Sequence, residues 1–231
     1  MPDTTATIVF DLDGTLADTA PDLIATLNLI LAEEGLEELP LGEARDLIGA
    51  GARALLERGI AANGRSVAAD HLEALYERFL VIYAGRIAVE TRLFPGVAAA
   101  LERFRAAGWR LAVCTNKIER HSVMLLEALG IAGHFHAICG RDTFPFSKPD
   151  PRHLTMTVAA AGGAPDAALM VGDSQTDIAT AKAAGIPVIA VPFGYTMTPV
   201  SELDPDVIID HFDGLWDAAA ALSRRSSFAG S

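Results

Sequence analysis

Asp11 and Asp13 are the first side chains along this sequence whose type and spacing could do chemistry, because they follow a short apolar run directly. Side chains two positions apart on an extended chain point the same way, so both carboxylates can face one small volume. Carboxylates that close repel each other, and one pKa rises unless a cation or a shared proton compensates. Gly14 then lets the chain turn and lets a ligand approach the backbone. The alternative for this short motif alone is an ordinary surface turn.

Further polar groups follow later apolar runs: Thr115 with Asn116, Lys148 before Pro149, and Asp173 with Ser174 and Asp177. Each has a plain structural explanation, since Thr115 could simply end a strand, Lys148 could lie in a surface turn, and the aspartates could cap a helix. At the carboxyl ends of parallel strands, however, these groups would all open on the same edge of a sheet, where ligands bind. Their shared position favours one common site over several unrelated roles.

The elements that must position these groups are short apolar strands that alternate with helices. The apolar runs predict strands at residues 8–10, 110–114, 136–139, 168–171, 187–191 and 207–209. The spacing of apolar residues between them predicts helices at 97–107, 118–129, 152–161, 178–184 and 214–222. Strands that alternate with helices imply right-handed crossovers. The predicted fold class is therefore α/β, with a Rossmann-like, mainly parallel sheet that carries helices on both faces.

A long segment after the first strand breaks this alternation. Thr19 and Asp22 have the spacing of a capping box and predict that a helix starts there. Further short helices are expected at 44–48, 52–58 and 71–83, and no convincing strand is found between Gly35 and about Val89. An all-helical run of this length is too long for a simple crossover between two strands.

The sequence therefore predicts two domains. We expect an α/β catalytic core of residues 1–16 and 91–231, a helical cap domain at 17–90 inserted into it, and a flexible tail at 223–231. The length of 231 residues allows one well-filled α/β domain with a smaller appendage, and the apolar content of 51% allows a substantial core.

Charge and composition exclude several classes of partner. The net charge of −12 argues against binding to nucleic acid or to an anionic membrane surface, and no apolar run approaches the length of about 20 residues that a membrane span needs. Cys114 and Cys139 fall in apolar strands and are expected to act as small hydrophobes. With no secretory signal at the start of the sequence, this predicts a cytoplasmic protein. The sequence does not indicate an oligomeric state.

As a set, the polar groups resemble the signature motifs of the haloacid dehalogenase superfamily, in its phosphatase branch. In chain order the matching segments are Asp11-Leu12-Asp13-Gly14-Thr15, Thr115, Lys148, and Gly172-Asp173-Ser174 with Asp177. The sequence is more closely similar to the phosphoglycolate phosphatase family, in the segments 11–23, 115–117, 142–151 and 193–195. The similarity covers nearly the whole chain, including the helical insertion between the first and second motifs.

The resemblance implies magnesium-dependent hydrolysis of a small phosphomonoester, 2-phosphoglycolate or a similar phosphorylated metabolite, through an aspartyl-phosphate. It assigns Asp11 as the nucleophile and Asp13 as the general acid and base. Lys148 would hold Asp11 ionised and bind the phosphoryl oxygens, and Thr115 would donate a hydrogen bond to them.

The resemblance also implies a metal site. Mg²⁺ would be held by the carboxylates of Asp11 and Asp173 and by the backbone carbonyl of Asp13. Asp177 and Ser174 would support this site from behind. Asn116, next to Thr115, would contribute to substrate binding.

In the helical insertion, the segment with Gly49, Gly51 and Arg53 is expected to face the substrate. A glycine-rich helix entrance exposes backbone amides, and Arg53 could clamp a carboxylate. The equal alternative is that the glycines only end one helix and start another. Lys117 is expected to face solvent, and Tyr195 either shapes the cleft or packs in the core.

The histidines show no spacing typical of zinc ligands and are expected to be structural or exposed. They are His71, His121, His134, His136, His153 and His211.

Two other functions remain alternatives at this point. A phosphosugar mutase would use the same phosphoenzyme, but no feature identifies a sugar acceptor. A non-catalytic metabolite-binding module on the same fold would leave the full set of chemical groups unexplained. Dehalogenase activity is disfavoured, because it needs no metal and would leave Asp13 and Asp173 without a role.

Overall fold

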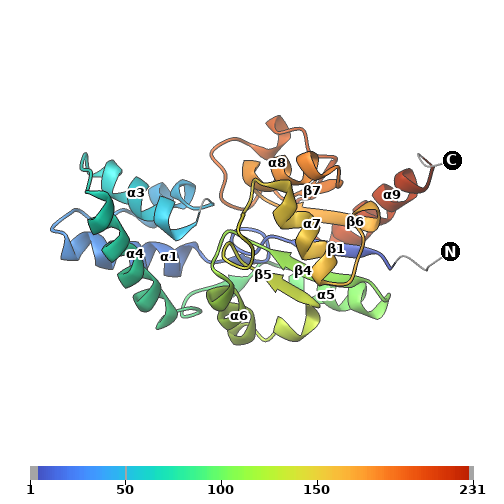
Figure 1. Cartoon of the computed structure of the whole chain (residues 1–231), viewed down its shortest axis with the longest axis horizontal. Coiled ribbons are helices and arrows are strands. Elements are labelled where there is room, and N and C mark those ends of the chain that lie inside the picture. Colours follow the sequence, from blue (N-terminus) through green and yellow to red (C-terminus); the bar gives the residue numbers. More distant parts are fainter. Residues whose placement is uncertain (1–4, 50, 229–231) are drawn as a thin grey trace.

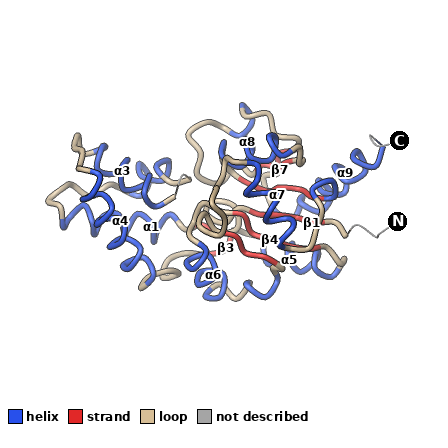
Figure 2. Tube along the Cα trace, viewed as in Figure 1, coloured by secondary structure: helices blue, strands red, loops and turns tan. Residues whose placement is uncertain are grey.

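A parallel sheet forms the centre of the molecule in the computed structural model, which describes residues 5–49 and 51–228. Its six strands follow the order β5-β4-β1-β6-β7-β8, and every neighbouring pair is parallel (Figures 1 and 2). The strands are β1 (Thr7–Phe10), β4 (Arg110–Cys114), β5 (Ala137–Cys139), β6 (Ala168–Gly172), β7 (Val188–Ala190) and β8 (Val207–Ile208). This arrangement confirms the predicted α/β fold class.

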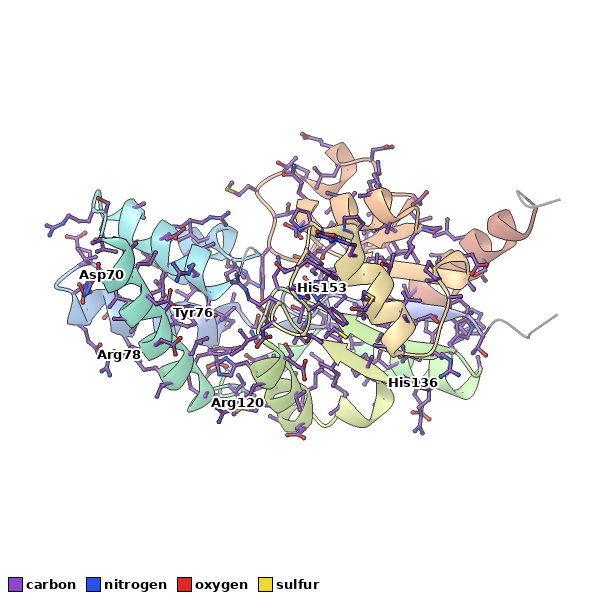
Figure 3. All side chains as sticks on the ribbon, viewed as in Figure 1. Asp70, Tyr76, Arg78, Arg120, His136 and His153 are labelled. Carbon is purple, nitrogen blue, oxygen red and sulfur yellow. The ribbon has the colours of Figure 1, made fainter. Side chains whose placement is uncertain are left out.

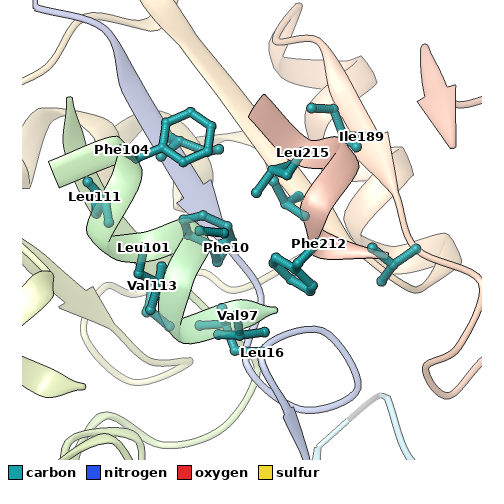
Figure 4. Close-up of a cluster of buried hydrophobic side chains, with 14 of the residues drawn as sticks. Phe10, Leu16, Val97, Leu101, Phe104, Leu111, Val113, Ile189, Phe212 and Leu215 are labelled. Carbon is teal, nitrogen blue, oxygen red and sulfur yellow. The ribbon is translucent and has the colours of Figure 1, made fainter. Parts of the chain in front are cut away.

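The side chains of β1 alternate between the two faces of the sheet, as the period of an extended chain requires. Ile8 and Phe10 belong to one buried cluster, shown in Figure 4, and Val9 belongs to the cluster on the opposite face. The first face is covered by α5 (Val97–Ala106), α6 (Glu119–Ala128) and α9 (Leu215–Phe228), and the second by α7 (Pro151–Ala160) and α8 (Gln175–Ala184). Each large apolar side chain buried in this way contributes about 1.5–3 kcal/mol to folding.

Short 3₁₀ turns complete the connections of the sheet. They are η2 (Ala132–His134), η3 (Pro165–Ala167), η4 (Val200–Glu202) and η5 (Phe212–Gly214). The predicted strands and helices of the α/β core are all present, with boundaries shifted by a few residues, whereas most of the helix expected at 44–48 is a 3₁₀ turn.

A helical insertion follows β1 and packs around a hydrophobic cluster of its own, on the left of Figure 1. Its elements are α1 (Ala20–Glu33), α2 (Leu41–Ala44), η1 (Arg45–Leu47), α3 (Ala52–Ala62) and α4 (Ala69–Ala84). Leu27, Leu56 and Phe79 are fully buried between these helices. Because β1 runs toward the insertion and the other strands of the sheet are parallel to it, the carboxyl edge of the sheet faces the insertion.

A small ribbon joins the insertion to the sheet and lies outside the stretch from Gly35 to Val89, in which no strand was expected. The strand β2 (Ala17–Asp18) pairs antiparallel with β3 (Arg92–Leu93). A strand of two residues is too short to show an alternating pattern, so the sequence could not reveal it.

The predicted capping box at the start of α1 is wrong. Thr19 occupies the N-cap position but makes no capping hydrogen bond through its side chain. Asp22 instead accepts hydrogen bonds from the backbone N–H groups of Glu90 and Thr91 at 3.0 and 2.9 Å, and from the Thr91 hydroxyl at 2.8 Å. Asp22 therefore binds the backbone where the chain leaves the insertion, instead of capping the helix as the sequence pattern predicted.

Other sequence-based expectations concern the cysteines and the chain end. Cys114 and Cys139 are buried free thiols, as expected for small hydrophobes. The helix α9 continues to Phe228, through most of the stretch expected to be a flexible tail, and residues 229–231 lie outside the described residues. The domain boundaries and the flexibility of the tail stay predictions.

Within residues 5–49 and 51–228, no helix combines the length and the apolar character needed to cross a lipid bilayer.

Candidate active site

The carboxyl edge of the sheet brings the predicted polar groups together. Asp11 and Asp13 follow β1, Thr115 follows β4, Asp173 follows β6, and Lys148 lies in the loop between β5 and α7. Parallel neighbours end at the same edge, so segments more than 150 residues apart in the chain meet there. A cavity between this edge and the helical insertion is lined by Asp11, Asp13 and Thr115.

Lys148 is the centre of a buried charge network, here called the inner cluster, which consists of Asp11, Lys148, Asp173 and Asp177. Lys148 Nζ lies 2.9 Å from Asp11 Oδ1 and 2.5 Å from Asp177 Oδ1. The side chain of Lys148 is 2% exposed and that of Asp177 is fully buried, so these charges interact with little screening. The structure therefore brings four predicted site residues into one group.

Asp173 is held from two directions within the inner cluster. Its Oδ1 accepts a hydrogen bond from the Thr15 hydroxyl at 2.7 Å, and its Oδ2 accepts one from the Tyr195 backbone N–H at 2.6 Å. A Cβ atom added at Gly14 or Gly194 would lie 2.5 or 2.2 Å from Asp173 Oδ2, so both glycines allow the chain to approach this carboxylate.

Asp177 serves two purposes at once. With Ser174 it forms a capping box at the start of α8, where the Ser174 hydroxyl and backbone N–H donate to Asp177 Oδ2 at 2.6 and 3.1 Å. Its other oxygen binds Lys148. Asp177 therefore caps a helix and also fixes the ammonium group of the inner cluster.

Burial and mutual repulsion set the electrostatics of the inner cluster. Burial, followed by the Asp177 charge, raises the pKa of Asp11 to about 6 in spite of the opposing effect of Lys148. The pKa of Asp173 is raised for the same reasons, while Asp11 and Asp177 raise the pKa of Lys148 against the effect of burial. Carboxylate oxygens of Asp11, Asp173 and Asp177 lie within 4.8 Å of one another. Three carboxylates around one ammonium group leave two negative charges uncompensated, which fits a divalent cation with oxygen ligands.

Lys117 corrects a second expectation, because it does not face solvent. Its Nζ lies 2.9 and 3.0 Å from the two carboxylate oxygens of Asp13, and its side chain is 5% exposed. The same ammonium lies 4.6 Å from the ring centroid of Tyr83 on α4, a cation–π contact. We call Asp13 and Lys117 the outer pair. Both of the contacts that bury Lys117 are long-range, so local sequence could not predict them.

The loop after β4 ties the two charge groups together. The Thr115 hydroxyl accepts a hydrogen bond from the Lys117 backbone N–H at 3.2 Å. The Asn116 side chain donates to the backbone oxygen of Lys148 at 3.1 Å. Thr115 and Asn116 both line the cavity, and this loop also fixes the backbone on either side of it.

Two of the three insertion residues that were expected to face the substrate line the cavity. Gly49 and Gly51 line the cavity, whereas Ala50 between them lies outside the described residues. Arg53 does not line the cavity, because its guanidinium pairs with Glu73 and lies over the ring of Tyr76 at 5.6 Å (Tyr76 is labelled in Figure 3).

Two basic residues of the cavity were not expected at the site, and His121 was expected to be structural or exposed. Arg141 follows β5 and His121 belongs to α6. Burial and the Lys117 charge lower the pKa of His121 to about 4, so its ring is neutral near neutral pH. Neither residue belongs to a recognisable motif, and only the fold brings them to the cavity.

Tyr195 is a buried connection between the sheet and the insertion. Its hydroxyl donates to Asp18 Oδ1 at 2.6 Å and accepts from the backbone N–H of Ala20 at 2.9 Å. Arg45 also binds Asp18 at 2.8 Å and lies over the Tyr195 ring. Tyr195 therefore packs at the entrance to the insertion, next to Asp173, which its backbone holds.

Comparisons with known proteins agree with this geometry. A family model described as haloacid dehalogenase-like hydrolase matches residues 8–191. A phosphoglycolate phosphatase from Mesorhizobium japonicum is 54% identical over 208 residues, which cover 90% of this chain and 92% of that protein.

Solved structures show the same similarity over nearly the full length. A predicted phosphoglycolate phosphatase from Haemophilus somnus 129PT gives a TM-score of 0.87 at 31% identity, covering 94% of this chain and 99% of that one. CbbY from Rhodobacter sphaeroides, solved in complex with phosphate, gives a TM-score of 0.78 at 26% identity and covers 91% of this chain and 96% of that one. These matches confirm the prediction of an enzyme of the phosphoric monoester hydrolase class. The chain belongs to the haloacid dehalogenase-like hydrolase family and is similar to its phosphoglycolate phosphatases.

Proposed function

We propose that this protein hydrolyses a small phosphomonoester, 2-phosphoglycolate or a similar phosphorylated metabolite, with Mg²⁺ and through an aspartyl-phosphate on Asp11. The observation that carries the proposal is the inner cluster at the carboxyl edge of the sheet, with Asp11 lining the cavity under the helical insertion. The names of the similar proteins support the choice of substrate.

The donor set fits Mg²⁺, a hard cation that prefers oxygen ligands. The carboxylates of Asp11 and Asp173 and the backbone carbonyl of Asp13 would hold the ion, while Asp177 binds the Lys148 ammonium group and caps α8 with Ser174. When bound, Mg²⁺ supplies positive charge that offsets the negative charge on the phosphoryl oxygens.

In the first step, a carboxylate oxygen of Asp11 attacks phosphorus in line with the ester oxygen. The P–O ester bond breaks, and the leaving alkoxide takes a proton from the Asp13 carboxyl group. Lys148, which lies 2.9 Å from Asp11, keeps the nucleophile ionised and attracts the phosphoryl oxygens. Thr115 donates its hydroxyl to the same oxygens.

In the second step, Asp13 takes a proton from water as the water oxygen attacks the aspartyl-phosphate. The acyl-phosphate bond breaks, inorganic phosphate leaves, and Asp11 is regenerated. Both oxygens of Asp13 contact Lys117 in this conformation. Each carboxylate oxygen keeps a second lone pair for the proton that moves, so Lys117 can orient Asp13 throughout both steps.

The segment 17–90 would act as a cap domain that excludes bulk water and selects the substrate. Its contacts with the cavity include Gly49, Gly51 and the α4 residues Tyr76 and Tyr83. A cytoplasmic location stays a prediction from the sequence.

The test is phosphate release from a panel of phosphorylated metabolites with Mg²⁺ and with excess chelator. We expect turnover of 2-phosphoglycolate or a similar small ester, loss of activity on chelation, and recovery when Mg²⁺ is restored. Full activity in chelator would contradict the metal assignment. Isomerised sugar phosphate without net phosphate release would indicate a mutase, and no turnover of any ester would indicate a binding module.

A further inference from the structure

Arg141 is a cation of the cavity that none of the chemical steps above uses. It lies in the loop after β5 and lines the same cavity as Asp11 and Asp13. Its backbone N–H donates to the backbone oxygen of Lys117 at 3.0 Å, so this loop is tied to the loop that carries Lys117. The position of Arg141 is therefore fixed relative to the outer pair.

Arg141 differs from the other cations around the cavity in having no anionic partner among the residues that the structure describes. Lys117 is paired with Asp13, Lys148 with Asp11, and Arg53 with Glu73. In the part of the chain that the structure describes, the Arg141 side chain makes no ion pair or hydrogen bond.

The neighbouring carboxylate does not neutralise Arg141 either. Asp142 accepts a hydrogen bond from the Glu119 backbone N–H at 2.7 Å and so is engaged at the start of α6. Among the residues that the structure describes, an unpaired guanidinium thus faces the cavity.

The guanidinium also reaches from the core to the insertion. A Cβ atom added at Gly51, the residue before α3, would lie 3.4 Å from Arg141 Nη1. Tyr76 of α4 lines the cavity beside Arg141, and Leu55 and Phe79 supply an apolar wall. Arg141 therefore lies where the insertion meets the core, on the boundary of the space in which a small substrate would bind.

We propose that Arg141 binds a carboxylate group of the substrate and so selects phosphomonoesters that carry a carboxylate close to the phosphate. This inference rests on the proposed function, since it takes the phosphoryl group to bind at Asp11. A guanidinium matches a carboxylate in a bidentate, charge-assisted hydrogen bond, and the apolar wall fits a short carbon chain between the two anionic groups. Arg141 thus takes the role that the sequence assigned to Arg53.

The test compares two esters of the same length. 2-Phosphoglycolate carries a carboxylate, and 2-hydroxyethyl phosphate has a neutral hydroxymethyl group in its place. We expect Arg141→Met to lower kcat/KM for 2-phosphoglycolate by about 10- to 100-fold, mostly through KM, because the lost contact is made equally in the ground state. Turnover of 2-hydroxyethyl phosphate should stay unchanged.

Arg53→Met is the matched control, because it removes an arginine near the same cavity whose charge Glu73 already neutralises. This variant should keep the wild-type preference between the two esters. Arg141→Lys keeps a charge but loses the bidentate geometry and should show a smaller rise in KM; it decides the question if Arg141→Met does not fold.

The outcomes separate this inference from the proposed function. Wild-type protein that releases phosphate from neither ester would contradict the proposed function itself. Wild-type turnover with equal losses on both esters in Arg141→Met would overturn the role of Arg141 and leave the hydrolase in place. A change of preference between the two esters in Arg53→Met, but not in the Arg141 variants, would show that Arg53 binds the substrate carboxylate.

Discussion

Lys148 and Lys117 each hold an aspartate of the loop after β1, but they do so in different surroundings. Lys148 contacts Asp11 and Asp177, all within the α/β core. Lys117 contacts Asp13 on one side and the ring of Tyr83, from the helical insertion, on the other. The contacts of Lys148 thus lie within the α/β core, whereas those of Lys117 also depend on the position of the insertion.

The difference indicates how a single loop can hold two carboxylates that have different roles in catalysis. Asp11 is fixed by buried neighbours that do not depend on the insertion, which suits a nucleophile that must stay aligned. Asp13 has a partner that contacts the insertion, so movement of the insertion would change what Asp13 touches. We therefore expect changes to the inner and outer groups to have different effects.

The largest expected effect comes from Asp11→Asn in the inner cluster. An amide cannot form an acyl-phosphate, so we expect turnover to fall by about 10⁴-fold or more and no phosphoenzyme to form. The fold should be kept, because the change removes one negative charge from beside Asp173 and Asp177. Rapid-quench labelling with peptide mapping measures the phosphoenzyme, and circular dichroism checks the fold. Turnover retained in Asp11→Asn would show that another residue is the nucleophile.

Asp13→Asn, in the outer pair, should have a smaller and different effect. The variant keeps its backbone carbonyl but can neither protonate the leaving group nor deprotonate water, a loss of about 10² to 10⁴ in rate. With an aryl phosphate, whose leaving group needs little protonation, the first step should survive better than the second. Asp13→Asn should then accumulate phosphate on Asp11, which hydroxylamine releases. Label on Asp13 in the wild type would reverse the two roles.

The lysines test the same contrast through stability. Lys148→Met leaves three carboxylates without their ammonium in a buried site, and we expect a loss of about 3–5 kcal/mol in the free energy of unfolding. Lys117→Met leaves Asp13 without its ammonium partner. Because the Asp13 side chain is 15% exposed at the cavity, the free energy of unfolding should fall by only about 1–3 kcal/mol. Urea unfolding of both variants in chelator gives the comparison. An equal or larger loss in Lys117→Met would show that the outer pair stabilises the fold at least as much as the inner cluster does.

The inner cluster could be predicted from the sequence because its signals are local. Asp11, Lys148 and Asp173 each follow an apolar strand, and parallel strands bring their carboxyl ends to one edge. Once the strands are recognised, the convergence follows from the fold class. The capping spacing of Ser174 and Asp177 could likewise be read from neighbouring residues.

The surroundings of the cavity could not be predicted in this way. Lys117 is buried by Asp13, 104 positions away, and by Tyr83 of the insertion. Arg53 pairs with Glu73 because α3 packs against α4, and Arg141 meets Gly51 because the insertion lies over the sheet edge. These contacts depend on how helices pack, which no local pattern specifies.

The smallest expected effect concerns His153, which supports the loop of Lys148 and lies in the centre of Figure 3. The Lys148 backbone N–H donates to His153 Nδ1 at 3.2 Å, and Nε2 lies 3.1 Å from the backbone oxygen of Gly140. The ring must therefore carry its proton on Nε2 and be neutral. Burial, followed by the Lys148 charge, lowers the pKa of His153 from its usual 6.5 to about 4.

The depressed pKa sets the direction of the pH dependence. In the unfolded chain His153 takes up a proton below about pH 6.5, whereas in the folded protein it does so only near pH 4. Its contribution to stability is therefore fully present above pH 6.5 and is lost as the pH falls from about 6.5 to about 4. His153→Gln keeps an acceptor and a donor but cannot titrate. Between pH 7 and pH 4.5, the free energy of unfolding should therefore fall by about 1–3 kcal/mol more in the wild type than in His153→Gln. Urea unfolding at several pH values measures the difference. Parallel profiles would show that protonation of His153 does not lower the free energy of unfolding. The acid sensitivity would then come from other groups, such as His121, whose pKa is also lowered to about 4.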